Sequence, residues 1–322
     1  MNKTILVTGG YGFIGSHVIE ELLHLDDIDL IINIDKLGVG SDIKNIPENK
    51  KIINYIFDLC DFQKLIEVFE KYKPSHIIHL AAESHVDRSI STPTSFVFSN
   101  VIGTTNILEC IRLVTPKSKM IHVSTDEVYG HLESLNDKPF VETTPLSPRS
   151  PYSSSKASSD LIALSYHSTY GMNVTVTRCC NNYGPRQANE KFIPTIIKSI
   201  ANNKKIPVYG SGMNIREWIY VKDHARALIE LCFGNFNNKV YNIYGFERMN
   251  NLSLIDNISS IIEKQRPDLK QSNYHVFVDD RKGHDFCYAM STNYPGELKT
   301  LLNQKDNFEK TVSYYLNKFI LS

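Results

Sequence analysis

Residues 4–15 read Thr-Ile-Leu-Val-Thr-Gly-Gly-Tyr-Gly-Phe-Ile-Gly, and an amphipathic segment follows them. The β-branched run predicts a strand, the spaced glycines a tight turn, and the amphipathic segment a helix. In such a unit Gly9 allows the turn, Gly12 lets the backbone approach a pyrophosphate, and Gly15 lets the helix lie close to the strand. Residues 4–15 therefore predict a dinucleotide-binding site.

The alternation of strand and helix patterns continues along the first half of the chain. Further strands are expected at 30–35, 52–57, 76–80, 120–124 and 174–178, and helices near 14–25, 62–72, 94–114 and 153–170. Strands that alternate with helices are typical of βαβ units. We therefore expect an α/β protein with a doubly wound, Rossmann-type parallel sheet.

The sequence pattern changes after about residue 178, where the periodic segments become shorter and are interrupted by Asn, Gly and Pro. We expect residues 1–178 to form the NAD-binding Rossmann domain and residues 179–322 a smaller C-terminal α/β domain that binds the substrate. Segments near 215–245 are expected to return to the first domain.

The composition excludes several classes of protein. Of 322 residues, 42% are hydrophobic and 22% charged, and 35 basic residues balance 35 acidic ones. This balance gives no general field for nucleic acid or an anionic membrane, and no apolar run approaches the roughly 18 residues of a membrane helix. The six cysteines form no C-x-x-C pair and have no His cluster beside them. We expect no nucleic-acid partner, no membrane segment, no metal site, and reduced thiols in a cytoplasmic protein.

Asp35 ends the second expected strand, twenty residues after Gly15. A carboxylate there accepts hydrogen bonds from both hydroxyls of the adenosine ribose and would repel a 2′-phosphate. Asp35 therefore favours NAD over NADP, although the charge of the neighbouring Lys36 would weaken this preference.

Tyr152 and Lys156 are four residues apart in an expected helix that follows Pro151, so their side chains share one helix face. A nearby ammonium group stabilises a phenolate and lowers the pKa of a phenol from its usual value of about 10. We expect Lys156 to lower the pKa of Tyr152 and to make this tyrosine a general base.

Another expected strand, residues 121–125, runs into Asp126 and Glu127. The carboxyl ends of parallel strands form the ligand-binding edge of an open α/β sheet. Thr125, Asp126 and Glu127 would bring a hydroxyl and two carboxyl groups to this edge, one acid–base pair more than the oxidation of an alcohol requires. Adjacent carboxyls shielded from water titrate apart, so one stays protonated as an acid while the other acts as a base.

Further motifs extend the pattern along nearly the whole chain. They are T-G-G-x-G-F-I-G at 8–15, A-A-E-S-H-V-D-R-S at 81–89, S-T-D-E-V-Y-G at 124–130, S-P-Y-S-x-S-K-A-S-S-D at 150–160, N-N-Y-G-P at 181–185, E-K-x-I-P at 190–194, R-E-W-x-Y-V-x-D-H-A-R-A-L at 216–228 and R-x-G-H-D at 281–285. With these motifs the chain resembles the nucleotide-sugar 4,6-dehydratases of the extended short-chain dehydrogenase/reductase family, especially the dTDP-glucose 4,6-dehydratases. In this fold T-D-E-V-Y separates the dehydratases from epimerases and reductases.

The resemblance implies a redox-neutral elimination with NAD held through turnover. Tyr152, assisted by Lys156 and Thr125, would take the proton of the C4 hydroxyl while hydride passes from C4 to NAD. Glu127 would then abstract the C5 proton, made acidic by the 4-keto group, while Asp126 protonates the departing C6 hydroxyl. Return of hydride to C6 and of a proton to C5 would give a 4-keto-6-deoxy sugar.

The resemblance also implies a set of binding residues. The adenosine and pyrophosphate side of NAD would contact Phe13, Ile14, Asp35, Lys36 and Asp58. The rest of the dinucleotide would contact Ala81, Ala82, Ser99 and Asn182. The hexose or its phosphate would face Ser84, Thr125 and Asn181. The substrate's pyrophosphate, ribose and base would be held by Lys191, Pro207, Tyr209, Arg216, Asn251, Arg281 and His284, and a guanidinium fork such as that of Arg216 matches a diphosphate.

Several segments depart from the family pattern, and for this reason the sequence does not decide which nucleotide sugar is the substrate. The segment between Gly130 and Glu142 is short, residues 186–189 read Arg-Gln-Ala-Asn in place of a more aromatic and proline-bearing stretch, and Lys282 replaces a proline. These segments are expected near the sugar-nucleotide pocket. The substrate is therefore dTDP-glucose or UDP-glucose, with UDP-GlcNAc and C5 epimerisation as alternatives.

Two other functions remain as alternatives to the dehydratase. A 4-epimerase or 4-keto reductase would need Tyr152 and Lys156 but not the pair Asp126 and Glu127, whereas an idle NAD-sensing protein would not need the complete set. The resemblance further implies a homodimer, packed through the helices expected near 94–114 and 153–170.

Overall fold

The structure is a computed structural model that describes residues 3–134, 136–236, 239–245, 247–280, 283–293 and 304–321. Seven strands among them form one sheet in which all neighbours run parallel. From edge to edge these strands are β10 (Val240–Ile243), β6 (Asn173–Cys179), β5 (Lys119–Thr125), β4 (His76–His79), β1 (Lys3–Thr8), β2 (Ile28–Asp35) and β3 (Ile52–Ile56). The chain winds outward from β1 in both directions, which confirms the predicted doubly wound fold.

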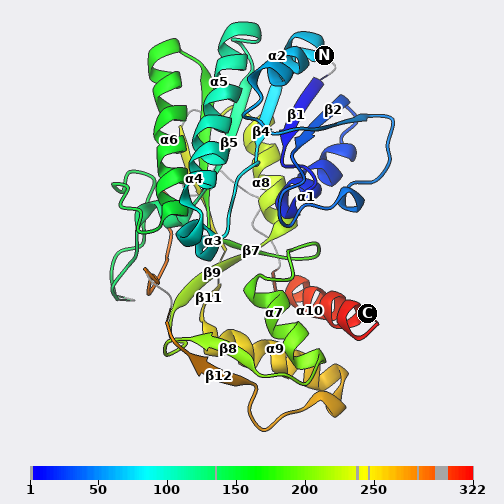
Figure 1. The fold of residues 1–322 in the computed structure, drawn as a ribbon, viewed down its shortest axis with the longest axis vertical. Helices are drawn as coiled ribbons and strands as arrows, with labels where there is room; N and C mark the ends of the chain where they lie inside the picture. Colours follow the sequence, from blue (N-terminus) through cyan, green and yellow to red (C-terminus); the bar gives the residue numbers. More distant parts are fainter. Residues whose placement is uncertain are drawn as a thin grey trace.

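Helices cover both faces of this sheet (Figure 1). One face is covered by α1 (Phe13–Leu23) and α8 (Val221–Phe233), and the other by α2 (Phe62–Tyr72), α5 (Gly103–Val114) and α6 (Pro151–Tyr170). Successive residues of β1 serve the two faces in turn, because strand side chains alternate. Ile5 is buried with α1 and α8, and Leu6 with α2 and α5.

The helix that carries Tyr152 has strong signals at both ends. The Ser150 side chain accepts from the Ser153 amide, and the Ser153 side chain in turn accepts from the Ser150 amide. This capping box satisfies two backbone donors at the helix start, where Pro151 lacks an N–H that the helix does not need. Gly171 ends the helix with a φ of +67°, a conformation that glycine adopts at little cost.

A smaller group of elements lies below the large sheet in Figure 1. It contains a three-stranded sheet of β11 (Glu247–Asn250), β9 (Ile215–Tyr220) and β7 (Asn181–Tyr183), and a parallel pair of β12 (His275–Val278) and β8 (Ile206–Tyr209). Its helices are α7 (Phe192–Ala201), α9 (Asn251–Gln265) and α10 (Gln304–Ile320). These helices pack together around Ile197, Ile258 and Val312, which are completely buried. The division of the chain into two domains at residue 178 stays a proposal.

The structure contains elements that the sequence patterns did not indicate. The expected helix at 94–114 is divided into α4 (Pro93–Phe96), a π-helical segment η2 (Val97–Ile102) and α5. The remaining short helices are η1 (Ile43–Asn45), α3 (Val86–Ser91), η3 (Asp126–Tyr129) and η4 (Pro267–Leu269). The π-helical segment carries Ser99 and Asn100 toward the edge of the sheet where the strands end, and π-bulges are frequent at functional sites.

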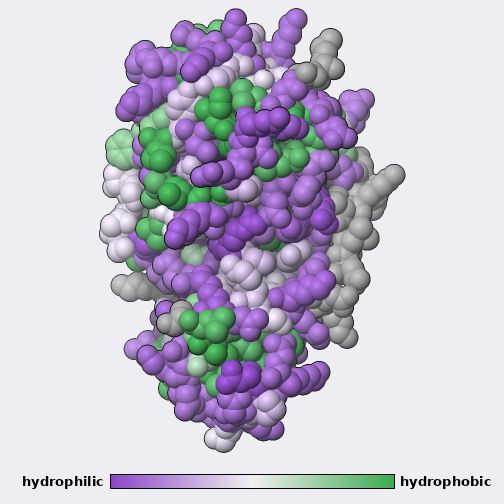
Figure 2. Space-filling model, turned by 90° about the vertical axis from the view of Figure 1, so that its right-hand side faces the viewer, coloured by the Kyte–Doolittle hydropathy of each residue, from purple (hydrophilic) through white to green (hydrophobic). Residues whose placement is uncertain are grey.

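The surface is of mixed character. The face drawn in Figure 2 is largely hydrophilic and carries hydrophobic patches on both its upper and its lower part. None of the helices in the described ranges has the length and apolar character that crossing a membrane requires.

The close contact at Gly15 yields a test of the fold. A Cβ at Gly15 would lie 2.2 Å from the Gly9 carbonyl oxygen, whereas a Cβ at Gly38 would meet its nearest neighbour at 3.5 Å. We expect Gly15→Ala to lower the free energy of unfolding by about 1–3 kcal/mol, because rigid backbone must move, and Gly38→Ala to leave it nearly unchanged. Urea unfolding of both variants measures this, and equal midpoints would contradict the contact.

Candidate active site

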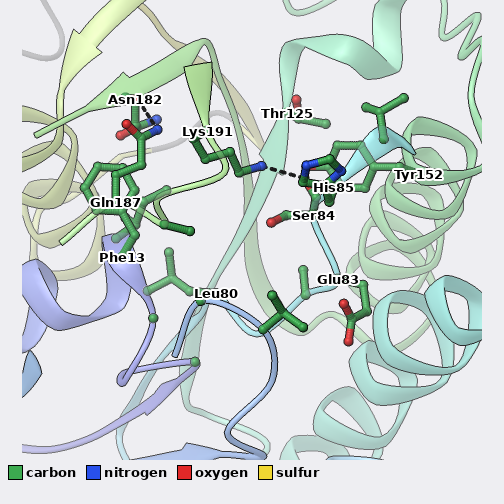
Figure 3. A pocket seen from close by; sticks show the side chains of 18 of the residues that line it. Phe13, Leu80, Glu83, Ser84, His85, Thr125, Tyr152, Asn182, Gln187 and Lys191 are labelled. Carbon is green, nitrogen blue, oxygen red and sulfur yellow. Dashed lines mark hydrogen bonds between the residues drawn. The ribbon is translucent and has the colours of Figure 1, made fainter. Parts of the chain in front are cut away.

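A cavity of about 580 Å³ opens at the carboxyl ends of the parallel strands. Its walls include Gly9 after β1, Ala81 after β4, Thr125 at the end of β5 and Cys179 at the end of β6. In Figure 3, Phe13, Asn182 and Gln187 gather on one side, and Ser84, His85, Thr125 and Tyr152 on the other. Open α/β sheets bind their ligands at this edge.

The glycine turn presents the start of α1 to this cavity. Gly12 is the N-cap of α1 and supplies no side-chain cap, so the first amides of the helix stay available to an anion. A Cβ at Gly9, whose φ is +73°, would lie 2.9 Å from the Ala81 backbone. The turn is thus narrow, uncapped and lined by backbone, which fits the pyrophosphate of a dinucleotide.

Asp35 and Lys36 fit the adenosine end of NAD. Asp35 accepts hydrogen bonds from the amides of Tyr11 and Leu37, at 3.0 and 2.8 Å, and is buried at the end of β2. Burial raises the pKa of this carboxyl against the effect of those hydrogen bonds. The Lys36 ammonium lies 3.0 Å from a Glu83 carboxylate oxygen and 3.6 Å from one of Asp58. Because acidic groups already surround Lys36, it weakens the preference for NAD less than its position in the sequence suggested.

Tyr152 and Lys156 are both buried on α6 beside the end of β5. The Lys156 ammonium donates to the Val123 carbonyl at 2.8 Å. Burial lowers the pKa of Lys156 to about 8, against the opposing effects of Asp160 and Cys179. Its protonation therefore changes near physiological pH.

The expected lowering of the Tyr152 pKa is wrong. Burial raises the pKa of Tyr152 well above its usual value, and the carboxylates of Glu127 and Asp126 raise it further. The hydrogen bond with Thr125 acts in the opposite direction. The sequence showed only the ammonium four residues away, whereas the fold adds burial and the negative charges from the end of β5.

Thr125, Asp126 and Glu127 follow one another where β5 ends in the short helix η3. The Thr125 hydroxyl donates to an Asp126 carboxylate oxygen at 3.2 Å and accepts from the Glu127 amide at 3.3 Å. Burial raises the pKa of Asp126 well above its usual value, and Glu127 and Glu217 add to the rise. Burial therefore favours the protonated form of Asp126, while Glu127 faces the cavity.

The far end of the cavity carries cationic and aromatic groups. Arg216 on β9 is buried; its guanidinium donates to the Asp285 carbonyl at 3.0 Å and lies 4.5 Å from the centre of the Tyr288 ring. The Lys191 ammonium donates to the Ser84 carbonyl at 3.1 Å (Figure 3). These two cations come from β9 and from the N-cap of α7, and both line the cavity.

Most of the predicted site residues meet in this one cavity. All fourteen residues predicted to contact the cofactor line it, the catalytic Tyr152 and Lys156 counted among them, as do nine of the ten predicted for the substrate. Arg281 lies outside the described residues. Asp126 is not part of the cavity wall; it lies behind it, with 2% of its surface exposed.

The cavity wall also includes residues that the sequence patterns did not single out, among them Glu83, His85, Cys179, Gln187 and Tyr288. Glu83 and His85 belong to the motif at 81–89, and Cys179 and Gln187 flank the motif at 181–185, so their place in these motifs was the available signal. Tyr288 had no such signal beyond following R-x-G-H-D by three residues.

Comparison with known proteins agrees with this geometry. Residues 6–309 match the family model described as GDP-mannose 4,6 dehydratase. The chain belongs to this 4,6-dehydratase family. A dTDP-glucose 4,6-dehydratase from Neisseria meningitidis serogroup B is 39% identical over 98% of this chain and 94% of the relative. A probable dTDP-glucose 4,6-dehydratase from Sinorhizobium fredii is 41% identical over 97% of this chain and 92% of the relative. These matches confirm the resemblance drawn from the motifs.

Solved structures show how far the fold alone discriminates. A dTDP-glucose 4,6-dehydratase from Streptomyces venezuelae, with NAD and TYD bound, superposes with a TM-score of 0.89 at 35% identity over 98% of this chain and 97% of that chain. A UDP-glucose 4-epimerase from Thermotoga maritima superposes with 0.86 at 27% identity over 98% and 99%. Dehydratases and epimerases share this fold, so the distinction rests on the residues at the end of β5.

A buried polar network supports the catalytic helix of this dehydratase. One Asp160 oxygen accepts from the Arg178 guanidinium at 3.0 Å, and the other lies 3.3 Å from the His122 Nε2. Arg178 also donates to the Tyr129 hydroxyl at 2.9 Å. Although burial alone would raise it, His122 and Arg178 hold the pKa of Asp160 below its usual value. The carboxylate is thus ionised one helical turn after Lys156.

Removing this charge tests the network. We expect Asp160→Asn to cost about 3–5 kcal/mol of stability at pH 7, because it leaves the Arg178 guanidinium buried without its carboxylate. Since folding lowers the pKa of Asp160, its charge stabilises the fold above the unfolded pKa of about 3.9 and ceases to do so as pH falls through the folded value.

The difference in unfolding free energy between wild type and Asp160→Asn should therefore shrink below about pH 4. Urea unfolding at pH 7 and in acid measures it. Ser158→Ala, at an exposed position of the same helix, is the control. A loss of the same size at both pH values would show that the charge of Asp160 is not what stabilises the fold.

Proposed function

We propose that this chain catalyses the NAD-dependent dehydration of a nucleotide-activated hexose to its 4-keto-6-deoxy derivative. The observation that carries the proposal is the meeting of two acid–base sets at one cavity, with Tyr152, Lys156 and Glu127 in its wall and Asp126 directly behind it. Tyr152 and Lys156 from α6 form one, and Asp126 and Glu127 at the end of β5 form the other. An oxidation alone requires only the first set, whereas an elimination of water requires both.

The glycine turn and Asp35 would hold NAD, which when bound would supply the acceptor for the C4 hydride and the donor of hydride to C6. Tyr152 takes the proton of the C4 hydroxyl, which Thr125 orients. The oxidised nicotinamide and the Lys156 ammonium would place positive charge near the phenol and offset the negative charges that raise its pKa.

Asp126 and Glu127 divide the elimination between them. Glu127 faces the cavity and removes the C5 proton, which is acidic once C4 is a ketone. Asp126, whose pKa burial and Glu127 raise, retains the proton that the departing C6 hydroxyl needs. Asp126 lies directly behind the cavity wall, beside the Thr125 hydroxyl that donates to it, and substrate binding must bring it within hydrogen-bond distance of the C6 hydroxyl for the proton to pass. Reprotonation of C5 completes the cycle.

The cationic end of the cavity supports a diphosphate substrate. Arg216 and Lys191 would bind its phosphates, with Ser84 and Asn181 near the hexose and Pro207, Tyr209, Asn251 and His284 around the nucleoside. The His284 Nδ1 lies 2.6 Å from an Asp280 oxygen, which orients this ring. Relatives named dTDP-glucose 4,6-dehydratases favour dTDP-glucose, with UDP-glucose and UDP-GlcNAc as alternatives.

Product mass tests this function directly. Purified protein is incubated without added reductant with dTDP-glucose, UDP-glucose or UDP-GlcNAc in turn. We expect one of them to lose 18 mass units, the mass of water, and Glu127→Gln to abolish this loss because the amide cannot take the C5 proton. The variant should still oxidise C4, visible as enzyme-bound reduced nicotinamide absorbance.

The other outcomes decide between the rivals. An unchanged mass with a new stereoisomer by NMR, insensitive to Glu127→Gln, would assign a 4-epimerase. An unchanged substrate in every case would favour an NAD-sensing protein and overturn the proposal.

We also propose that the enzyme is a homodimer in the cytoplasm. Hydrophobic side chains on η2, α5 and α6 are exposed in the single chain, namely Val97, Phe98, Leu113 and Leu161. A shared apolar face on neighbouring helices favours burial against a second copy. The six cysteines, all free thiols, fit a reducing compartment.

Light scattering tests the dimer. We expect twice the chain mass of 36.7 kDa at micromolar concentration. Leu161→Asp should reduce it toward a single chain, because the charge would be buried in the interface. Val276→Asp, at an exposed position of β12 away from these helices, should leave the mass unchanged. A wild type of 36.7 kDa would refute the dimer.

A further inference from the structure

Residues 184–188, here called the crossing segment, follow β7 and form part of the cofactor side of the cavity. Gln187 and Ala188 line the cavity, and Gln187 lies beside Asn182 and Phe13 in Figure 3. The Gln187 side chain donates to the Asn182 carbonyl at 2.9 Å. A Cβ at Gly40, in the loop after Asp35, would touch the Ala188 side chain at 3.4 Å. The crossing segment thus reaches from the glycine turn to the adenosine end of the site.

Arg186 fastens this segment from outside the cavity. Its backbone has a φ of +70°, which a residue other than glycine seldom adopts, so the surroundings must hold it. Its guanidinium donates to the carboxylate of Glu20 on α1 and, at 3.1 Å, to the Asn45 carbonyl. The segment is therefore tied to α1, the helix whose first turn faces the pyrophosphate site, and to η1.

Hydrogen bonds from two further side chains, His17 and Tyr315, also hold the crossing segment. His17 on α1 donates from Nε2 to the Pro185 carbonyl at 3.0 Å, and burial lowers the pKa of this histidine to about 4, so it is neutral near pH 7. On the other side, the buried Tyr315 hydroxyl lies 3.1 Å from the Gly184 carbonyl and 2.9 Å from the Gln187 carbonyl. One wall of the cofactor site is thus held by side chains of α1 and α10.

The ion pair is placed where it can open. Arg186 and Glu20 expose 23% and 26% of their side chains, so water can replace the contact without unfolding the core. Although partial burial would raise it, the hydrogen bonds from Lys222 and Arg186 lower the pKa of Glu20 to about 2. Glu20 is therefore charged at every pH at which the protein works. His17, Tyr315 and the backbone would keep the segment folded when the pair separates.

We propose that the ion pair between Arg186 and Glu20 is a latch that holds the crossing segment closed over NAD throughout the catalytic cycle. The inference rests on the proposed function, because hydride taken from C4 must return to C6 of the same sugar. Reduced cofactor that left between these steps would strand an oxidised sugar. Arg186 is thus a positioning residue that acts on the cofactor through the crossing segment.

Adjacent glutamates on α1 provide a matched pair of variants. Glu20→Gln removes the negative charge that pairs with the Arg186 guanidinium. It also removes the charge that faces the Lys222 ammonium, 2.7 Å from the other Glu20 oxygen, whereas Arg186→Gly leaves that second pair in place. Glu21→Gln removes one charge from the same helix and breaks the contact with Arg226 on α8 at 2.9 Å, which does not involve the crossing segment. Arg186→Gly removes the guanidinium and at the same time relieves the positive φ.

The readout is NAD itself rather than turnover. Each protein is loaded with NAD and passed through a desalting column, and the release of bound NAD is followed after dilution. We expect Glu20→Gln and Arg186→Gly to release NAD at least about tenfold faster than wild type, as the loss of one charge-assisted hydrogen bond would give. Glu21→Gln should match wild type. Arg186→Gly should lose retention without losing thermal stability.

The outcomes separate the latch from the function it rests on. A wild type that holds no NAD would refute the cofactor assignment itself. A wild type that retains NAD, with equal release rates for Glu20→Gln, Glu21→Gln and Arg186→Gly, would refute the latch and leave the proposed function intact. Faster release that tracks a lower melting temperature in all three variants would show a merely structural role for the pair.

Discussion

The closeness of β1 to the first turn of α1 constrains everything at the sheet edge. Gly15 has no space for a Cβ because the Gly9 carbonyl occupies it, and Gly9 has none because of the Ala81 backbone. This packing brings the amides of α1 to the carboxyl ends of β1 and β4, so an anion bound there lies beside the residues that follow β5. The glycine turn therefore opens into the same cavity as Tyr152 and Thr125.

Burial shifts the pKa values of the acidic and basic groups at this edge in opposite directions. The same low-polarity surroundings that raise the pKa of Asp126 lower that of Lys156 to about 8. Burial alone thus favours the protonated form of one group and the neutral form of the other, without special chemistry in either. Asp160, ionised through its contacts with Arg178 and His122, opposes the effect of burial on Lys156. The polar network under β5 belongs to the active site as much as to the core.

The sequence predicted those elements whose conformation is decided by residues close together in the chain. Periodicity and turns indicated the first six strands and the cavity-facing motifs, because each is decided within a few residues. The seventh strand, β10, depends on pairing with β6 more than sixty residues earlier, and the π-helical segment that carries Asn100 appears only through contacts. Asn100 accepts from the Glu83 amide and donates to the Ser155 hydroxyl, which joins the motifs at 81–89 and 150–160. The raised pKa of Tyr152 and the burial of Asp126 are likewise collective, since they depend on what surrounds each group.

At residues 186–189, which depart from the family pattern, the structure gives an explanation that the sequence alone did not. From sequence, the replacement of a more aromatic and proline-bearing stretch by residues 186–189 indicated only an altered substrate pocket. In the fold, Arg186 points away from the cavity and reaches Glu20 and Asn45, while its neighbours Gln187 and Ala188 line the cofactor side. The departure thus concerns how the cofactor is enclosed. An enzyme that takes a hydride from C4 and returns it to C6 needs this enclosure as much as its acid and base. If the reduced cofactor left between the two transfers, the sugar would remain oxidised and no product would form.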